Sequence, residues 1–228
     1  VFDLPTVADA GMDQEQCGGS SVMLSANVPI NGIGVWTLTS GPNVPIISNP
    51  NDPNSSVSSM VPGVYVFHWA ISSGTCTLSE DEVEVIIYEF PPFIDAGPNQ
   101  FLCNVNNVSL NGNVGSVGNS FWSFISGPNT PTISSPSSPS TNVSGMIPGI
   151  YTLSLNIING VCAVHSDTIQ ISIDALPTVA SAGPDLDLCN VTSITLAGND
   201  PASGAALWNL ISGPNSPLIV YPDSGNTS

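Results

Sequence analysis

The sequence predicts an all-β chain built from tandem β-sandwiches, and three observations carry this prediction. The same landmark residues recur along the 228 residues at a constant spacing. Within each repeat, apolar and polar residues alternate with a period of two, which is typical of strands that bury one face. The chain also contains 21 glycines and 21 prolines, which punctuate short strands and leave no helix of useful length.

The repeat has a period of 86 residues and contains no gaps. Cys17 returns as Cys103 and Cys189, and the motif Ser40-Gly41-Pro42-Asn43 returns at 126–129 and 212–215. We therefore divide the chain into repeats at 1–90, 91–176 and 177–228. The third repeat is truncated, because the third copies of Pro62-Gly63-x-Tyr65 and of the second cysteine would lie beyond the last residue.

The expected strands follow in the same order in each unit. One short strand carries Val22 and Leu24, and another begins near Trp36. A longer strand alternates from Tyr65 to Ile71, and a last one alternates from Val83 to Ile87. The predicted inward residues of the second unit are the counterparts: Val108, Leu110, Trp122, Phe124, Tyr151, Leu153, Leu155, Ile157, Ile169, Ile171 and Ile173.

About seven short strands, a central Trp36 and a Gly-x-Tyr that enters the penultimate strand describe an immunoglobulin-like β-sandwich. The connection from Ile87 to Ile94 contains two prolines and no flexible Gly/Ser run. Such a linker limits bending, so we expect the sandwiches to form a rod-like array.

The composition excludes several functions. The chain has no Lys or Arg and a formal net charge of −17. Nucleic-acid binding and adhesion to anionic membranes both need basic residues, and phosphate-handling enzymes need a Lys or Arg clamp. No apolar run approaches the length of a membrane span, and no signal peptide opens the chain, so we expect no direct membrane insertion.

The five cysteines predict a disulfide framework in an exported protein rather than a zinc site. Pairing within each unit would join Cys17 to Cys76 and Cys103 to Cys162, and would leave Cys189 unpaired. In the expected topology, however, Cys17 and Cys76 lie at opposite ends of the sandwich, roughly 20 Å apart. That separation exceeds the reach of a disulfide. A bond between repeats would join Cys17 to Cys162, and both pairings remain open at this point.

Acidic and amide side chains recur near the domain junctions. Asp9 and Asp13, and then Asp95 and Asn99, have the same spacing, which makes them weak calcium candidates. The alternative is that they are simply solvated, since Ser181 breaks the pattern in the third unit. We expect no cofactor. Glu80-Asp81-Glu82 is interpreted as a charged strand edge that discourages edge pairing.

The two histidines give no support to catalysis. His68 and His165 do not recur, because their counterparts are Ser154 and Ser79. We expect both to be solvated surface residues, and without a recurring His a Ser-His-Asp mechanism has no basis. The chain is therefore not expected to be an enzyme.

Several motifs also resemble a known family. Ala10-Gly11-x-Asp13-Gln14, Trp36, the segment from Pro62 to Phe67 and the strand that ends at Ile87 resemble the PKD-like domain. The version with Cys-Gly, Ser-Gly-Pro-Asn and Ser-Gly-x-Cys resembles the tandem repeats of giant surface proteins of Bacteroidota, including gliding-motility adhesins. One departure is that Trp36-Thr37-Leu38 stands where many PKD domains have Trp-Asp-Phe-Gly-Asp.

The resemblance implies export by the type IX secretion system and display at the bacterial cell surface as a stalk or filament. It brings no catalytic residues. Asp167-Thr168-Ile169 resembles the O-glycosylation acceptor of Bacteroidota, and Thr168 lies on the outward register of its strand.

The leading hypothesis is thus an extracellular structural or adhesive repeat region of a large surface adhesin or filament. The alternative is a carbohydrate-binding module that is accessory to a secreted polysaccharide-active enzyme. The expected partners are adjacent repeats of the same chain, with surface glycans or other copies in a filament as further candidates. The absence of a recurring polar cluster favours the structural role.

Overall fold

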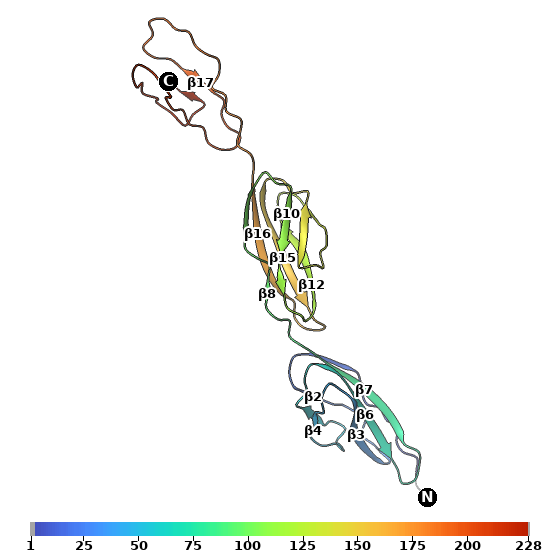
Figure 1. Cartoon of the computed structure of the whole chain (residues 1–228). Helices are drawn as coiled ribbons and strands as arrows, with labels where there is room; N and C mark the ends of the chain where they lie inside the picture. Colours follow the sequence, from blue (N-terminus) through green and yellow to red (C-terminus); the bar gives the residue numbers. More distant parts are fainter. Residues whose placement is uncertain (1–2, 228) are drawn as a thin grey trace.

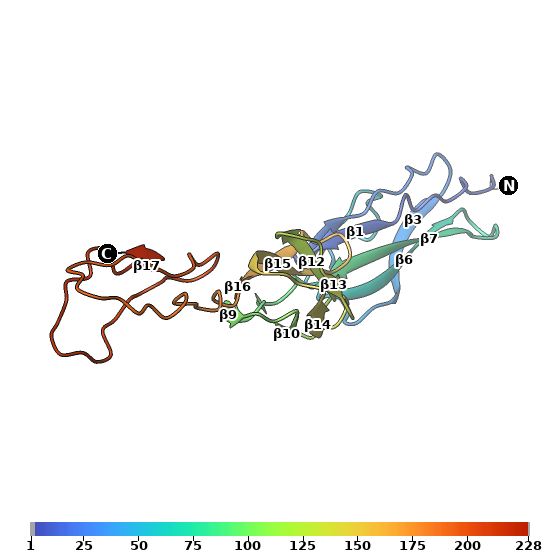
Figure 2. The ribbon, with the colours of Figure 1, turned by 90° about the horizontal axis from the view of Figure 1, so that it is seen from above.

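The computed structural model describes residues 3–227 and arranges them as three units end to end, with the N- and C-termini at opposite ends (Figure 1). The view from above keeps the same order (Figure 2). The regular structure of these residues consists of strands alone. The prediction of an all-β, rod-like array of sandwiches is therefore confirmed. No helix within residues 3–227 is long and apolar enough to cross a membrane.

The first unit contains two facing sheets. The larger has the order β1-β7-β6-β3 and the smaller β2-β5-β4. The β1 strand is parallel to β7, from Gln14 opposite Val85 to Cys17 opposite Tyr88, whereas the other pairs are antiparallel. The strands are β1 (Gln14–Cys17), β2 (Ser21–Met23), β3 (Ile33–Ser40), β4 (Ile46–Ile47), β5 (Ser56–Ser58), β6 (Gly63–Ser72) and β7 (Ser79–Tyr88).

The core of the first unit lies between these sheets. The inward positions of the alternating pattern on β6, Tyr65, Phe67, Trp69 and Ile71, are fully buried. The rings of Trp36 and Trp69 pack with their centroids 5.0 Å apart, which joins β3 to β6 at the centre of the unit. Burial of these large side chains supplies the main driving force for folding.

The second unit repeats this plan with the orders β12-β15-β16-β9 and β10-β14-β13, and adds a short β11-β8 pair. Again the first long-sheet strand, β9, is parallel to the last, β16, and Cys103 lies opposite Asp174. The strands are β8 (Ile94–Asp95), β9 (Gln100–Cys103), β10 (Asn107–Asn111), β11 (Asn113–Val114), β12 (Asn119–Ser126), β13 (Thr132–Ile133), β14 (Ser140–Ser144), β15 (Gly149–Ile158) and β16 (His165–Asp174).

The two complete units bury equivalent positions. The core of the second includes Trp122, Tyr151 and Ile171, which are the counterparts of Trp36, Tyr65 and Val85 in the first. The period-two alternation therefore predicted the buried face correctly along both central strands.

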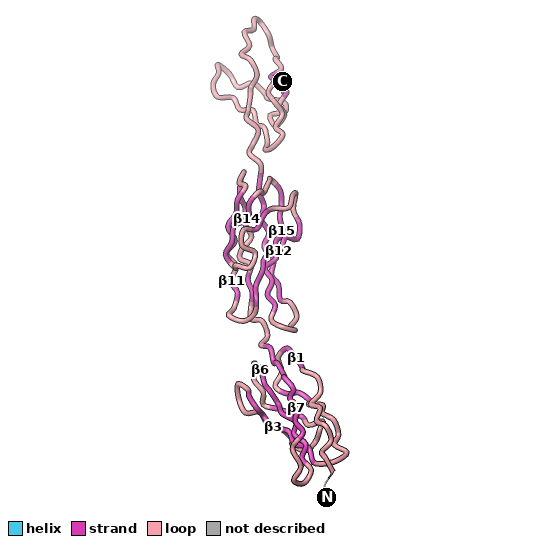
Figure 3. The backbone as a smooth tube through the Cα atoms, turned by 90° about the vertical axis from the view of Figure 1, so that its right-hand side faces the viewer, coloured by secondary structure: helices cyan, strands magenta, loops and turns pink. Residues whose placement is uncertain are grey.

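The third unit differs, because its regular structure over residues 177–227 consists of β17 (Leu196–Ala197) and β18 (Asn226–Thr227) (Figure 3). Ile194, the counterpart of buried Val22, is 39% exposed, and Trp208 is only half-buried. The physical reason is that this segment lacks the two central strands of the long sheet. Residues 177–228 hold no counterparts of β6 and β7, which form the middle of the long sheet in the first unit and supply half of its core.

Candidate functional site

The most strongly recurring motifs meet at one corner of each sandwich. Gly41 lies against the ring of Tyr65, where a Cβ atom would come within 2.5 Å of Cδ1. Gly63 has a φ of 142° and packs on the ring of Pro42, where a Cβ atom would come within 2.8 Å. The side chain of Asn43 is hydrogen-bonded to the hydroxyl of Tyr65. These contacts therefore hold the corner of the sandwich together.

The weak calcium candidates are hydrogen-bond acceptors for the backbone. Asp13 Oδ1 accepts from the amide of Glu84 at 2.8 Å, and Asn99 Oδ1 makes the same bond to Gln170 at 2.8 Å. Asp9 and Asp95 accept from the glycine amides two residues further on. Because the neutral side chain of Asn99 accepts the same hydrogen bond as Asp13, this position requires a hydrogen-bond acceptor and not a negative charge.

No group of three or more His, Cys, Asp or Glu side chains within residues 3–227 is placed to hold a metal ion.

The acidic stretch Glu80-Asp81-Glu82 is more than a charged edge. Asp81 Oδ2 accepts a 2.7 Å hydrogen bond from the amide of Ala10, and Asp167 Oδ2 makes the same bond to Ala96 at 2.8 Å. Each carboxylate ties the segment that precedes the parallel strand, β1 or β9, to the last strand of its own unit. The interpretation as a charged strand edge did not include this role of Asp81, and the recurrence of Asp81 as Asp167 was the signal that could have identified it.

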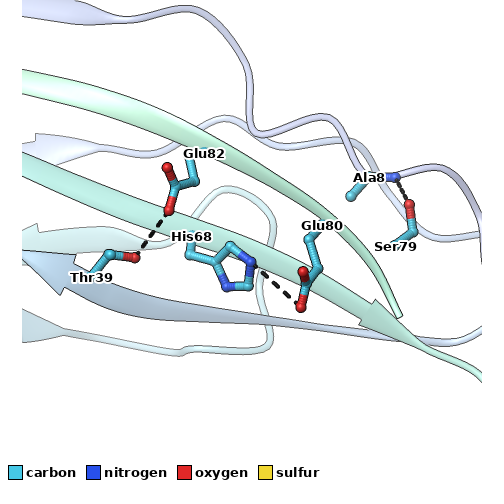
Figure 4. Close-up of polar contacts among 6 residues, drawn as sticks. All are labelled: Ala8, Thr39, His68, Ser79, Glu80 and Glu82. Carbon is cyan, nitrogen blue, oxygen red and sulfur yellow. Dashed lines mark hydrogen bonds and ion pairs between the residues drawn. The ribbon is translucent and has the colours of Figure 1, made fainter. Parts of the chain in front are cut away.

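His68 is half-buried rather than fully solvated, because it lies on the central strand β6 with neighbours on both sides. Its Nε2 lies 3.8 Å from Glu80 Oε1 (Figure 4). The neighbouring hydroxyl of Thr39 donates to Glu82 rather than to the imidazole. These contacts do not form the nucleophile-base pair that a hydrolase needs. His165 is exposed at the start of β16.

Thr168 lies on the outer face of β16, opposite Ser154 of β15, and is exposed. Its neighbour Asp167 is already bound to the Ala96 amide. The Thr168 hydroxyl is therefore accessible to an enzyme that would modify it.

The structure has one of the two cysteine pairings that the sequence left open. Cys17 is bonded to Cys162 of the next unit, with Cα atoms 4.9 Å apart. Cys103 and Cys189 are exposed thiols. The Cys76 sulfur lies 3.7 Å from the Asp3 carbonyl oxygen, as the Cys162 sulfur lies 3.6 Å from that of Glu89. The same turn thus contacts the same chain position at the head of each unit.

The junction around this disulfide is closely packed. Asn159 Nδ2 donates to the Glu89 carbonyl at 2.8 Å, and Gly160, at a φ of 53°, lies against the ring of Tyr88. Gly18 lies against Phe90, and its amide donates to the carbonyl of Tyr88 at 2.8 Å. The turn of the second unit that contains Asn159 and Gly160 therefore packs on the C-terminal end of β7. Sequence reasoning missed these contacts, because they depend on how two units stack.

An apolar groove of about 430 Å³ opens in the third unit. Its lining includes Leu196, Trp208 and Leu210, the counterparts of Leu24, Trp36 and Leu38. In the first unit those positions pack against β6. The groove is therefore the uncovered half of a sandwich core.

The fold and the junction define a class of protein, namely a tandem array of immunoglobulin-like β-sandwiches. The chain is similar to the structure of Sidekick-1 immunoglobulin domains 1–5, with a TM-score of 0.53 and 13% identity over 78% of this chain and 41% of that one. It is also similar to the titin I-band fragment I67–I69, with a TM-score of 0.50 and 11% identity over 95% of this chain and 84% of that one.

Within this class, residues 96–173 match the family described as the K319L-like PKD domain. The chain is also 24% identical over 200 residues to the human dyslexia-associated protein KIAA0319. This alignment covers 79% of the chain and 18% of the human protein, so the chain spans less than a fifth of its relative's length. The second unit is thus similar to a PKD domain, in line with the motif resemblance.

Proposed function

We propose that this chain is an extracellular stalk segment of a larger surface adhesin or filament, with repeats at 1–90, 91–176 and 177–228. The observation that carries the proposal is the junction, where the Cys17–Cys162 disulfide and a packed turn join one sandwich to the next. Disulfides persist in oxidising compartments, which supports a location outside the cell. The end-to-end arrangement supports a spacer that holds other parts of the protein at a distance.

A non-enzymatic role belongs to this proposal. The recurring polar groups, among them Asn43, Asp13 and Asp81, are occupied by contacts within their own unit. Adjacent repeats are the partners in contact, and other copies of the chain remain candidate partners in a filament. The role therefore depends on shape and strength rather than on chemistry.

The finer assignment is to the gliding-adhesin type of Bacteroidota, exported by type IX secretion. It rests on the motif resemblance, whereas the relatives described above include a human protein. Labelling of intact cells of the source organism with an antibody against residues 3–176 tests the location. We expect labelling without permeabilisation. Signal that requires permeabilised cells would contradict the proposal.

A carbohydrate-binding module is the competing function. A glycan array probed with the full chain separates the two, because a stalk should show no saturable binding. Reproducible binding to one glycan class, abolished by an alanine substitution on one exposed face, would favour the module.

Modification of Thr168 is a further part of the proposal. Mass spectrometry of the protein from its native host should find a glycan on this residue, and Thr168→Ala should remove it. Modification of another hydroxyl residue in its place, such as half-buried Thr152 or Ser172, would contradict the motif assignment.

A further inference from the structure

The Cys17–Cys162 bond creates a covalent connection between the two ends of the chain that bypasses most residues of the first two units. The residues it joins are 145 positions apart in sequence. A chain pulled from its two ends is therefore connected through residues 1–17, the disulfide and residues 162–228. We propose that this disulfide is a mechanical staple that carries tension from one repeat to the next without loading the hydrogen bonds between strands.

The position of Cys17 determines what would happen without the bond. Cys17 is the last residue of β1, which runs parallel to β7 and ends opposite Tyr88. Tension would then enter at the start of β1 and leave through Tyr88 into the linker. The two strands would be pulled past each other along their length. The four residue pairs from Gln14–Val85 to Cys17–Tyr88 would have to resist this sliding.

With the bond present, β1 is held at both of its ends. Cys17 is tied directly to Cys162, three residues before β16 begins at His165. The β16 strand, which ends at Asp174, then runs along the second unit toward the third (Figure 1). Tension therefore passes along β1, across the disulfide and along β16. Neither strand is dragged against its neighbour, so the sheets stay unloaded.

The covalent route is also too short to allow much lengthening. Residues 3–17 and 162–174 together extend to roughly 100 Å, at about 3.5 Å per residue. Without the bond, residues 3–174 would extend to roughly 600 Å. Two sandwiches whose longest strands have 10 residues each, about 33 Å per strand, already occupy most of the shorter length end to end. The stapled pair can therefore lengthen by only roughly 30 Å, even if both cores unfold.

This inference goes beyond the proposed stalk role, since it concerns how the rod bears load and not where it is displayed. The test pulls single full-length molecules from handles at the two termini. The oxidised protein is compared with the protein in reducing agent and with the Cys17→Ser/Cys162→Ser variant. The matched control is Cys103→Ser/Cys189→Ser, which removes two exposed thiols and leaves the staple intact.

We expect reduction, or the Cys17→Ser/Cys162→Ser variant, to add about 500 Å of unfolded contour length, because 145 residue steps are released. The control variant should extend like the oxidised parent. Reduction of the wild-type protein after it has folded gives the same reading if the double variant folds poorly. Equal extension of oxidised and reduced molecules would overturn the proposal. So would non-reducing peptide mapping that links Cys17 to another cysteine, with chymotrypsin used because the chain offers no trypsin site.

Discussion

The hydroxyl of Tyr65 donates a hydrogen bond to Oδ1 of Asn43 and accepts one from the amide of Val61 at 2.8 Å. Tyr151 and Asn129 have the same relationship in the second unit. The Tyr comes from the Pro-Gly-x-Tyr motif and the Asn from Ser-Gly-Pro-Asn. Two motifs that are separated in sequence thus recur together because one hydrogen-bonded corner requires both.

Tyr65→Phe should lower the stability of the first unit by about 1–2 kcal/mol, because the Asn43 side chain and the Val61 amide lose a partner. Hydrogen exchange measures this unit by unit, with amides of β6 compared with amides of β15. Tyr151→Phe is the matched variant and should weaken β15 instead. Equal protection of β6 in the parent and in Tyr65→Phe would contradict a stabilising corner.

Asp81→Ala should destabilise the first unit by about 1–3 kcal/mol, since the amide of Ala10 would lose its acceptor in a buried place. Glu82→Ala is the control. Its carboxylate is exposed and makes only a 3.4 Å bond to Thr39, so its loss should change stability by less than about 0.5 kcal/mol. Urea unfolding measures both, and a Glu82 effect as large as that of Asp81 would show general charge removal to be the cause.

Gly160→Ala should disturb the junction. A Cβ atom there would lie 2.2 Å from the ring of Tyr88, and the φ of 53° adds backbone strain. Gly145→Ala is the control, because Gly145 has a φ of 76° but no atom within 4 Å of the new Cβ. We expect the Gly160 variant to lose about 1–3 kcal/mol more than the control in urea unfolding. Equal losses would mean that Tyr88 does not pack against this turn.

The fold could be predicted from sequence because its information is local. Alternation from Tyr65 to Ile71 fixes which face is buried, and the exact repeat applies the same reading to Tyr151 and Ile157. The third unit shows the limit of this reasoning. Trp208 lies in the same sequence motif as Trp36, but this motif forms no sandwich core where the strands that correspond to β6 and β7 are absent from residues 177–227.

From the sequence, the disulfide partner of Cys17 could only be narrowed to two alternatives, Cys76 and Cys162. Strand geometry argued against Cys17–Cys76, but the choice of Cys162 depends on how one unit seats on the next. The role of Asp81 was missed for a different reason. An acidic residue in a row of three is usually solvated, and only its partner Ala10, far away in sequence, reveals the hydrogen bond.

The last prediction concerns the stiffness of the junction. The two units are joined twice, by the linker and by the Cys17–Cys162 bond, and two separated connections restrict bending more than one. The linker adds its own support, because Pro92 packs on Gly115 of the second unit.

Small-angle scattering of the full chain should therefore show an elongated particle. Replacement of Pro91 and Pro92 by Gly should change the largest dimension little while the disulfide is intact. The same replacement combined with Cys17→Ser should shorten the average largest dimension, because a single flexible connection allows the units to fold toward each other. A parent protein that scatters as a compact side-by-side pair would contradict the rod, and an unchanged profile in the combined variant would show that neither connection sets the angle between the repeats.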